Sequence, residues 1–300
     1  MTTPQTPNFD RISPTALLVA CARQMSGLPY TREIVELTDA FTVVKQFLAL
    51  DNQTADKLAS GAPVRLQTAI GAALIEARYR AIEQGLARFR PTQILELASG
   101  LLPRGMIWSE NPEITFVESD LPTMIEQKQQ VVEHLIGSRP NLHFQAIDAT
   151  QRPNPLLCNA VFDAAKPLAI VCEGLLMYLT FAEKQQVCAN VRELLQTYGG
   201  VWITSDFSTL EDRQRRHQHE VMQQIDAKIA SATGRAFADN EFATVDHAKQ
   251  FVAAQGFQVE AFSRVDVIDQ LQCLAGLDID RGQFQPLLTV PIFALTLATH

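Results

Sequence analysis

Acidic residues in this sequence follow apolar runs at the points where strands of a parallel sheet would end. Glu96 lies in an apolar run just before the small-residue turn 98–100, and a second apolar run at 114–117 leads into Glu118 and Asp120. A glycine turn lets a ligand approach the backbone, and an acid about 20 residues further on accepts hydrogen bonds from ribose hydroxyls. Gly100 and Asp120 have that spacing, which predicts a nucleoside site in a doubly wound α/β sheet.

The glycines that are missing from the turn narrow the choice of nucleoside. A dinucleotide site needs G-x-G-x-x-G, so that a pyrophosphate can rest on bare backbone at a helix N-terminus. The segment 98–103 reads ASGLLP and keeps only one of the three glycines. A phosphate-binding loop is excluded because Met106 and Ile107 stand where Lys and Ser or Thr would hold phosphate and magnesium. A nucleoside without phosphates remains, and S-adenosylmethionine is the common one.

Two further acids extend the series. Asp148 follows the apolar run 142–147, where a carboxylate beside a free N–H can pair with the amino group and a ring nitrogen of adenine. Glu173 follows 168–172, a continuous apolar run of the kind expected in a strand buried on both faces. Ligands of open α/β sheets lie beyond the carboxyl ends of the strands. We therefore expect these acids and those of the first two strands to meet at one edge of the sheet.

Four runs together resemble the leucine carboxyl methyltransferase family, which includes phosphatase carboxyl methyltransferases and polyketide carboxyl and hydroxyl methyltransferases. They are LELASGLLPRG at 95–105, VESDLP at 117–122, IDA at 147–149 and EGLLMYL at 173–179. The segments ISPTA at 12–16 and EARYR at 76–80 are also similar to family signatures. The resemblance covers most of residues 12–206, and EGLLMYL is its most specific part.

The resemblance implies S-adenosylmethionine as cofactor and assigns its amino-acid end to three positions. Arg78 would hold the methionine carboxylate, and Gly100 would line the amino-acid portion. Glu173 would lie near the methionine amino group and the methyl group that is transferred. One departure concerns this end of the site, because Leu102 stands where many relatives have an acid, although Arg104 is kept.

The nucleoside and the acceptor are assigned in the same way. Asp120 would bind the ribose, with Glu118 as a second candidate. Asp148 and the backbone of Ala149 would bind adenine, and Tyr178 would face the acceptor.

Each of these residues also has a structural interpretation. Strand-end acids often cap the helix that follows, and for Glu96 a capping role and a cofactor role both stay open. Tyr178 could equally be part of the core. His217 and His219 lie in a charged helical segment and are expected in solvent.

Composition bounds the class of protein. The chain has 300 residues, 47% of them hydrophobic, and a net charge of −8, which disfavours nucleic acid as the main partner. No apolar stretch is long enough to cross a bilayer, and the first ten residues are polar, so we expect a cytoplasmic protein. The five cysteines include no C-x-x-C pair, which favours a reducing compartment and disfavours a zinc site.

The element pattern predicts a seven-stranded methyltransferase sheet with additions. We expect an N-terminal tail and helical cap at 1–90, the cofactor-binding sheet at 91–206, a helical lid insertion at 207–243, and a C-terminal helix and strands at 244–300. The strands are expected at 93–97, 114–118, 142–147, 168–172, 201–205, 257–262 and 291–298.

The hypothesis for function is methyl transfer to a carboxylate or an acidic hydroxyl of a small molecule. A carboxylate is ionised at pH 7 and needs no base, whereas an alcohol needs a base with a pKa near neutral pH. Two alternatives stay open, a nicotinamide oxidoreductase and a catalytically silent binding protein with the same fold. The sequence predicts neither the acceptor nor the oligomeric state.

Overall fold

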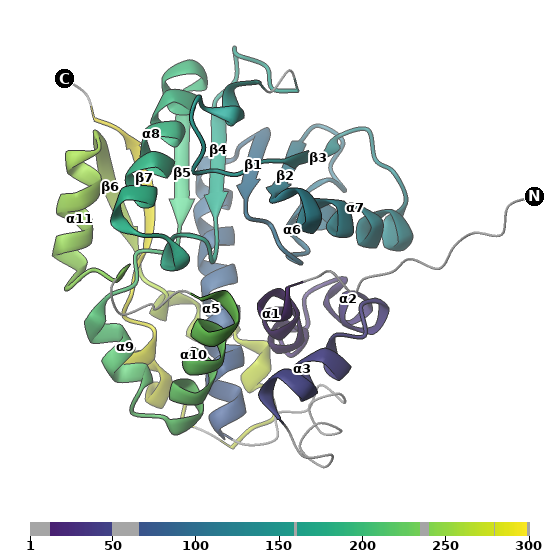
Figure 1. Ribbon diagram of the computed structural model, residues 1–300, viewed down its shortest axis with the longest axis vertical. Coiled ribbons are helices and arrows are strands. Elements are labelled where there is room, and N and C mark those ends of the chain that lie inside the picture. Colours follow the sequence, from purple (N-terminus) through teal and green to yellow (C-terminus); the bar gives the residue numbers. More distant parts are fainter. Residues whose placement is uncertain (1–12, 50–65, 159–160, 235–239, 279, 299–300) are drawn as a thin grey trace, which may run out of the picture.

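The centre of the molecule is a seven-stranded sheet with the strand order β3-β2-β1-β4-β5-β7-β6 (Figure 1). The computed structural model describes residues 13–49, 66–158, 161–234, 240–278 and 280–298. The strands are β1 (Gln93–Leu97), β2 (Thr115–Asp120), β3 (Leu142–Ala146), β4 (Leu168–Cys172), β5 (Gly200–Thr204), β6 (Phe257–Phe262) and β7 (Ile292–Leu297). β1 to β5 are parallel, and β7 runs antiparallel to both β5 and β6. The predicted doubly wound sheet with an antiparallel final pair is confirmed.

Successive strand residues point into two different hydrophobic cores, one on each face of the sheet. Ile94 of β1 packs in a core with α5 (Leu66–Phe89), α6 (Arg104–Trp108) and α7 (Pro122–Ile136). Leu95 packs on the other face, in a core with α8 (Phe181–Tyr198) and α11 (Val245–Ala254). Because both faces of the sheet are covered, every residue of the central strands β1 and β4 is buried, which explains why their sequences are mostly apolar.

Local signals in the sequence set the ends of α8, the helix that follows the EGLLMYL run at 173–179. Thr180 and Glu183 form a capping box at its start, where each side chain accepts a hydrogen bond from the backbone of the other. Gly199 ends the helix with a φ of 66°, and Gly200 follows with a φ of 105°. A Cβ atom at Gly200 would lie 2.0 Å from the Leu168 carbonyl oxygen, so the close pairing of β4 and β5 requires glycine there.

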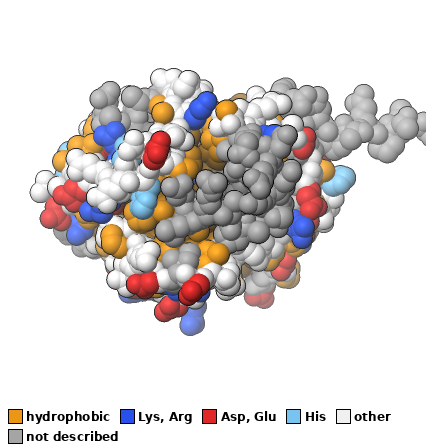
Figure 2. All heavy atoms as spheres, turned by 90° about the horizontal axis from the view of Figure 1, so that it is seen from below, with side chains coloured by type: hydrophobic (Ala, Val, Ile, Leu, Met, Phe, Trp, Pro, Cys, Tyr) orange, Lys and Arg blue, Asp and Glu red, His pale blue; other side chains and the backbone are white. Residues whose placement is uncertain are grey.

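Helices from two distant parts of the chain gather beyond the carboxyl ends of the parallel strands (Figure 1). They are α1 (Pro14–Gln24), α2 (Thr31–Leu37) and α3 (Ala40–Leu48) from the N-terminal part, and α9 (Leu210–Arg216) and α10 (Glu220–Thr233) from the insertion. α10 contacts α1, α3 and α5. Seen from this end, the molecule shows hydrophobic side chains toward the middle of the face and charged ones mainly around its rim (Figure 2).

The insertion after β5 contains two helices where the sequence predicts one polar lid helix. The chain turns between Arg216 and Glu220. The two ends of the insertion are joined at its base, because the Leu210 N–H donates to the Phe242 carbonyl at 2.8 Å and the Phe242 N–H donates to the Ser208 carbonyl at 3.2 Å.

Helix α5 links the predicted cap to the sheet. It contacts β4, β5 and β7 as well as α1. The short 3-10 helices are η1 (Pro155–Cys158), η2 (Leu176–Tyr178), η4 (Val265–Gln270), η5 (Gln272–Leu274) and η6 (Arg281–Leu287). None of the helices that the structure describes combines the length and the apolar character needed to cross a membrane.

Candidate active site

Asp120 lies beside the glycine turn at the end of β2, as the spacing predicts. One oxygen of its carboxylate accepts a hydrogen bond from the Gly100 N–H at 2.8 Å, and the other accepts from the Leu121 N–H at 2.8 Å. Burial raises the pKa of Asp120, while these two N–H groups and the nearby Lys128 ammonium oppose the rise. The turn itself holds Ala98 and Gly100 in the left-handed region, with φ values of 52° and 47°.

Asp148 and Ala149 follow β3 at the same edge of the sheet. The Asp148 Oδ1 atom accepts hydrogen bonds from the Thr150 N–H at 2.9 Å and the Thr150 hydroxyl at 2.6 Å. The Ala149 carbonyl accepts from the Asn190 amide at 2.8 Å. These bonds fix the orientation of the Asp148 carboxylate, and its role toward adenine stays a prediction.

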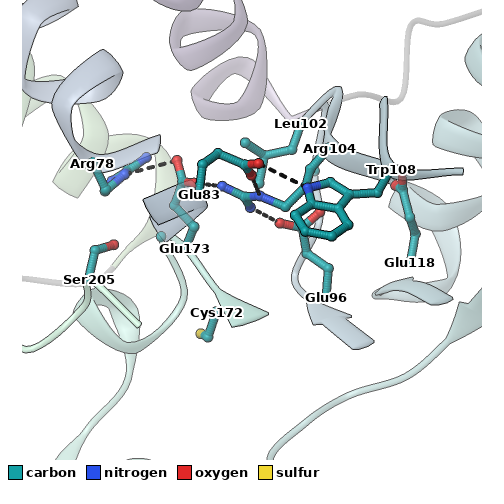
Figure 3. Close-up of polar contacts among 12 residues, drawn as sticks. Arg78, Glu83, Glu96, Leu102, Arg104, Trp108, Glu118, Cys172, Glu173 and Ser205 are labelled. Atoms are coloured by element: carbon teal, nitrogen blue, oxygen red, sulfur yellow. Dashed lines mark hydrogen bonds and ion pairs between the residues drawn. The ribbon is translucent and has the colours of Figure 1, made fainter. Parts of the chain in front are cut away.

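Glu173 stands at the end of β4 among three arginines, of which Figure 3 labels Arg78 and Arg104. Its Oε1 atom accepts from Arg23 at 2.7 Å and from Arg78 at 3.0 Å, and its Oε2 atom accepts from Arg104 at 2.9 Å. Burial alone would raise the pKa of Glu173, but the charges of Arg78, Arg23 and Arg104 outweigh it and lower the pKa to about 2. Glu173 is therefore an ionised anchor for the arginines.

Arg104 connects Glu173 to two more acids (Figure 3). Its guanidinium group forms an ion pair with Glu96, and its Nε atom donates to Glu83 at 2.7 Å. The second oxygen of Glu83 accepts from the Trp108 indole at 2.9 Å. Burial raises the pKa of Glu96 to about 7, against the opposing charge of Arg104. The Glu96 side chain thus faces Arg104 inside the protein, and its predicted contact with the cofactor remains untested.

Glu118, the second candidate for the ribose, lies below the turn. Its side chain is fully buried, and its carboxylate forms an ion pair with Lys128 at 2.7 Å. A Cβ atom on Gly105 would lie 2.1 Å from Glu118 Oε1, so this acid packs directly against α6. Of the two acids on β2, Asp120 is the one whose carboxylate accepts a hydrogen bond from the backbone of the glycine turn.

The loop after Glu173 is shaped by Asp206, which follows β5. The two carboxylate oxygens of Asp206 accept hydrogen bonds from the N–H groups of Gly174 at 2.7 Å, Leu175 at 2.6 Å and Leu176 at 3.0 Å. Three backbone donors on one acid hold the start of the EGLLMYL run in a fixed conformation.

Tyr178 ends this loop between the sheet and the helices beyond it. Burial raises the pKa of Tyr178, the charge of Arg78 opposes the rise, and Asp206 and Asp226 of α10 add to it, while a hydrogen bond with Thr15 of α1 lowers it. The phenol is therefore neutral at pH 7 and can donate a hydrogen bond. Its predicted position facing the acceptor stays a prediction.

His217, which we expected in solvent, has a partner inside the insertion. Its Nε2 atom lies 2.7 Å from Asp226 Oδ2, and the histidine side chain is 31% exposed. The pair joins the end of α9 to α10.

Sequence reasoning missed Arg23, Lys128 and Asp206. Arg23 and Lys128 lie on helices whose other buried positions are mostly apolar, and a charged residue on a buried helical face is the signal that could have found them. Asp206 follows β5 directly and could have been found by the same strand-end rule that found the other acids.

Two solved structures have a fold similar to that of this chain over most of its length. A candidate methyltransferase from Thermobifida fusca has a TM-score of 0.55 and 15% identity, and the match covers 100% of both chains. A protein of the duf574 family from Streptomyces avermitilis has a TM-score of 0.54 and 15% identity, covering 94% of this chain and 97% of that one. At these identities the likeness supports the fold class, an α/β fold of the methyltransferase type.

Sequence comparison identifies the family. A candidate S-adenosyl-L-methionine-dependent methyltransferase from Mycolicibacterium vanbaalenii is 25% identical over 276 residues, which are 84% of this chain and 85% of that relative. The family model for leucine carboxyl methyltransferases matches residues 29–192, and the chain belongs to this family. It is an S-adenosylmethionine-dependent methyltransferase, which removes the oxidoreductase and the silent binding protein from consideration.

Arg78 of α5 has donor groups left for an anionic ligand beside the end of β4. Arg78 uses its Nε atom on Glu173, and no described residue accepts a hydrogen bond from its two terminal nitrogens. These nitrogens lie 3.8 and 4.0 Å from the position of a Cβ atom on Gly174, where the absence of a side chain leaves room for a carboxylate. Within the described chain, no cluster of histidine, cysteine or acidic side chains could hold a metal ion.

Proposed function

We propose that the enzyme transfers the methyl group to a carboxylate of a small-molecule acceptor. Arg23 and Arg78 share a single oxygen of Glu173, and this observation carries the proposal. Two guanidinium groups on one carboxylate oxygen leave positive charge at the edge of the site, which favours anionic ligands. The methionine carboxylate at Arg78 balances this one excess charge, and the positive sulfonium of the bound cofactor then favours an anionic acceptor.

The protein's part in the reaction is to hold the acceptor. Bound S-adenosylmethionine supplies an activated methyl group on a sulfonium. Tyr178 donates a hydrogen bond to one acceptor oxygen, and the other oxygen is left free to attack. Holding the reacting groups in near-attack geometry contributes on the order of 7–11 kcal/mol. A carboxylate has no proton to lose, so no base is needed.

A hydroxyl acceptor is the second candidate, and the His217–Asp226 pair favours it. A histidine oriented by an acid is a common general base, and Asp226 is close enough to Tyr178 to contribute to its raised pKa. In that case His217 would remove the proton of an acidic hydroxyl.

The experiment starts with the cofactor. S-adenosylhomocysteine should bind in calorimetric titration and raise the melting temperature, because a ligand that binds only the folded state stabilises it. NAD should do neither. The acceptor is then sought in a panel of aromatic and aliphatic acids, each paired with its alcohol or phenol analogue, by following the release of S-adenosylhomocysteine.

The pH profile and one variant separate the two acceptor classes. Methylation of a carboxylate should be level from about pH 6 to 8.5, and His217→Gln should keep most of it. Methylation of a hydroxyl should rise with pH, and His217→Gln should lower it about 10²- to 10⁴-fold. If only the phenols are methylated, and His217→Gln loses this activity, the acceptor is a hydroxyl and the carboxylate proposal is wrong.

A further inference from the structure

Lys128 lies under the glycine turn without being exposed to solvent. It belongs to the second turn of α7, and its side chain reaches back beneath the turn. Its ammonium group donates to the Gly100 carbonyl at 3.2 Å and to the Leu102 carbonyl at 2.5 Å, and it forms an ion pair with Glu118 at 2.7 Å. All three of these partners lie in one cluster beneath the turn.

The turn depends on such support. Ala98 and Gly100 both have left-handed backbone conformations, which a residue with a Cβ atom adopts at a cost. The Gly100 peptide is fixed from two sides, because its N–H donates to Asp120 while its carbonyl accepts from Lys128. Without the ammonium group, the carbonyls of Gly100 and Leu102 would lose the donor they share.

Glu118 holds Lys128 in place. The acid is fully buried and packs against Gly105, where a side chain would displace it. The positive charge of Lys128 also reaches Asp120, where it opposes the effect of burial and lowers the pKa of that acid. Lys128 therefore acts on both parts of the predicted cofactor site, the turn and the ribose acid.

We infer that Lys128 is a positioning residue for S-adenosylmethionine binding, which fixes the turn 98–102 from below. The inference rests on the cofactor site of the proposed function and is independent of the acceptor. Lys128 acts through the turn and through its charge near Asp120, because its ammonium group is already paired with protein atoms.

The test compares S-adenosylhomocysteine binding in three variants by calorimetric titration. In Lys128→Met/Glu118→Gln, both charges of the pair are removed, so that no uncompensated carboxylate stays buried. In Lys128→Met alone, the buried Glu118 carboxylate is left without its positive partner. Lys184→Met is the matched control, since Lys184 is also buried and donates to two carbonyls, those of Leu179 and Asn240, at 2.6 Å each.

The double variant should bind S-adenosylhomocysteine about tenfold more weakly than the parent, the effect of one lost charge-assisted hydrogen bond. Its melting temperature should lie above that of Lys128→Met. Lys184→Met should have a lower melting temperature than the parent and the same affinity for S-adenosylhomocysteine. The pH at which binding falls on acidification should move upward in the double variant, because Asp120 loses a neighbouring positive charge.

Two outcomes would overturn the inference. Affinity that follows melting temperature across all three variants, with an unchanged pH profile, would give Lys128 a merely structural role. A double variant with parental affinity would show that the turn needs no support from below. Failure of the parent to bind S-adenosylhomocysteine would be recognised first and would count against the cofactor site and this inference together.

Discussion

Glu173 is the best-connected acid of the site, and its surroundings decide what it can do. Both of its oxygens accept from arginines, and its low pKa keeps it ionised throughout the physiological range. A carboxylate with a pKa near 2 is a weak base. These contacts favour a role in orienting Arg23, Arg78 and Arg104, and the predicted place of Glu173 near the methionine amino group and the methyl group stays a prediction.

Asp120 should be essential for binding the cofactor. In Asp120→Ala a charge-assisted hydrogen bond to the ribose is lost, about 1.5–3 kcal/mol or roughly ten- to a hundredfold in affinity for S-adenosylhomocysteine. Asp163→Ala is the control, since that acid caps an exposed turn by accepting from the Ala165 N–H. Parental affinity in Asp120→Ala would mean that another group binds the ribose.

Glu96 should make the folded state less stable as the pH rises. Its pKa is raised from 4.5 to about 7 by burial. Between these two values the folded protein holds a proton that the unfolded chain has released, so the free energy of unfolding falls with rising pH. Urea unfolding at pH 5.5 and 7.5 should show this fall in the parent and a smaller one in Glu96→Gln. An equal fall in both proteins would place the titration on another group.

Glu173, at the end of β4, has the opposite effect on how stability depends on pH. The pKa of Glu173 is lowered from 4.5 to about 2, so its contribution to stability is present above about pH 4.5 and is lost on acidification toward pH 2. The two acids joined by Arg104 thus favour the folded state most strongly near pH 4.5.

The two helices of the insertion are attached to the protein in different ways. α9 is anchored at the base, where Arg213 forms an ion pair with the buried Glu241 at 2.7 Å. α10 buries only Met222 and Ile229 among its apolar side chains. A helix with so little buried surface opens at low free-energy cost, so we assign the moving part of the predicted lid to α10.

Hydrogen exchange should separate these helices. In the free protein, amides of 220–233 should exchange faster than those of 210–216, and both should be slower when cofactor and acceptor are bound together, because closure completes the acceptor pocket. Substitutions on α10 should change acceptor preference and leave the affinity for S-adenosylhomocysteine unchanged. Equal protection of α10 and the sheet strands without ligand would contradict a lid.

Strands were easier to predict than the lid. A buried parallel strand is a continuous apolar run between polar segments, which explains why β1 and β4 have the bounds that the sequence predicts. The break between α9 and α10 was missed because neither glycine nor proline marks it, since the residues between the two helices read HQH at 217–219. Arg23 was missed because its partner Glu173 is 150 residues away.

At the scale of the molecule, the cap and the sheet share one core. Leu17 of α1 and Ile34 of α2 belong to the same hydrophobic cluster as Ile82 of α5 and Ile203 of β5. The division into a cap and a sheet domain therefore describes the order of the chain, and we expect the two parts to unfold together.

Calorimetry should show a single unfolding transition for the cap and the sheet. Ile82→Ala should lower the free energy of unfolding by about 2–5 kcal/mol, as for other large apolar residues removed from a core. It should shift that transition as a whole. Two separate transitions, with only one moved by the substitution, would show that the cap folds independently.

The insertion leaves and rejoins the body of the protein at one place, where Ser208 and Leu210 pair with Phe242. A segment closed by its own hydrogen bonds can change in length and sequence while the strands on either side keep their register. The same scaffold can thus be given a new insertion, with the arginines and the glycine turn left as they are. Since the lid is predicted to select the acceptor, we expect an exchange of 211–241 between family members to transfer acceptor choice from one enzyme to another.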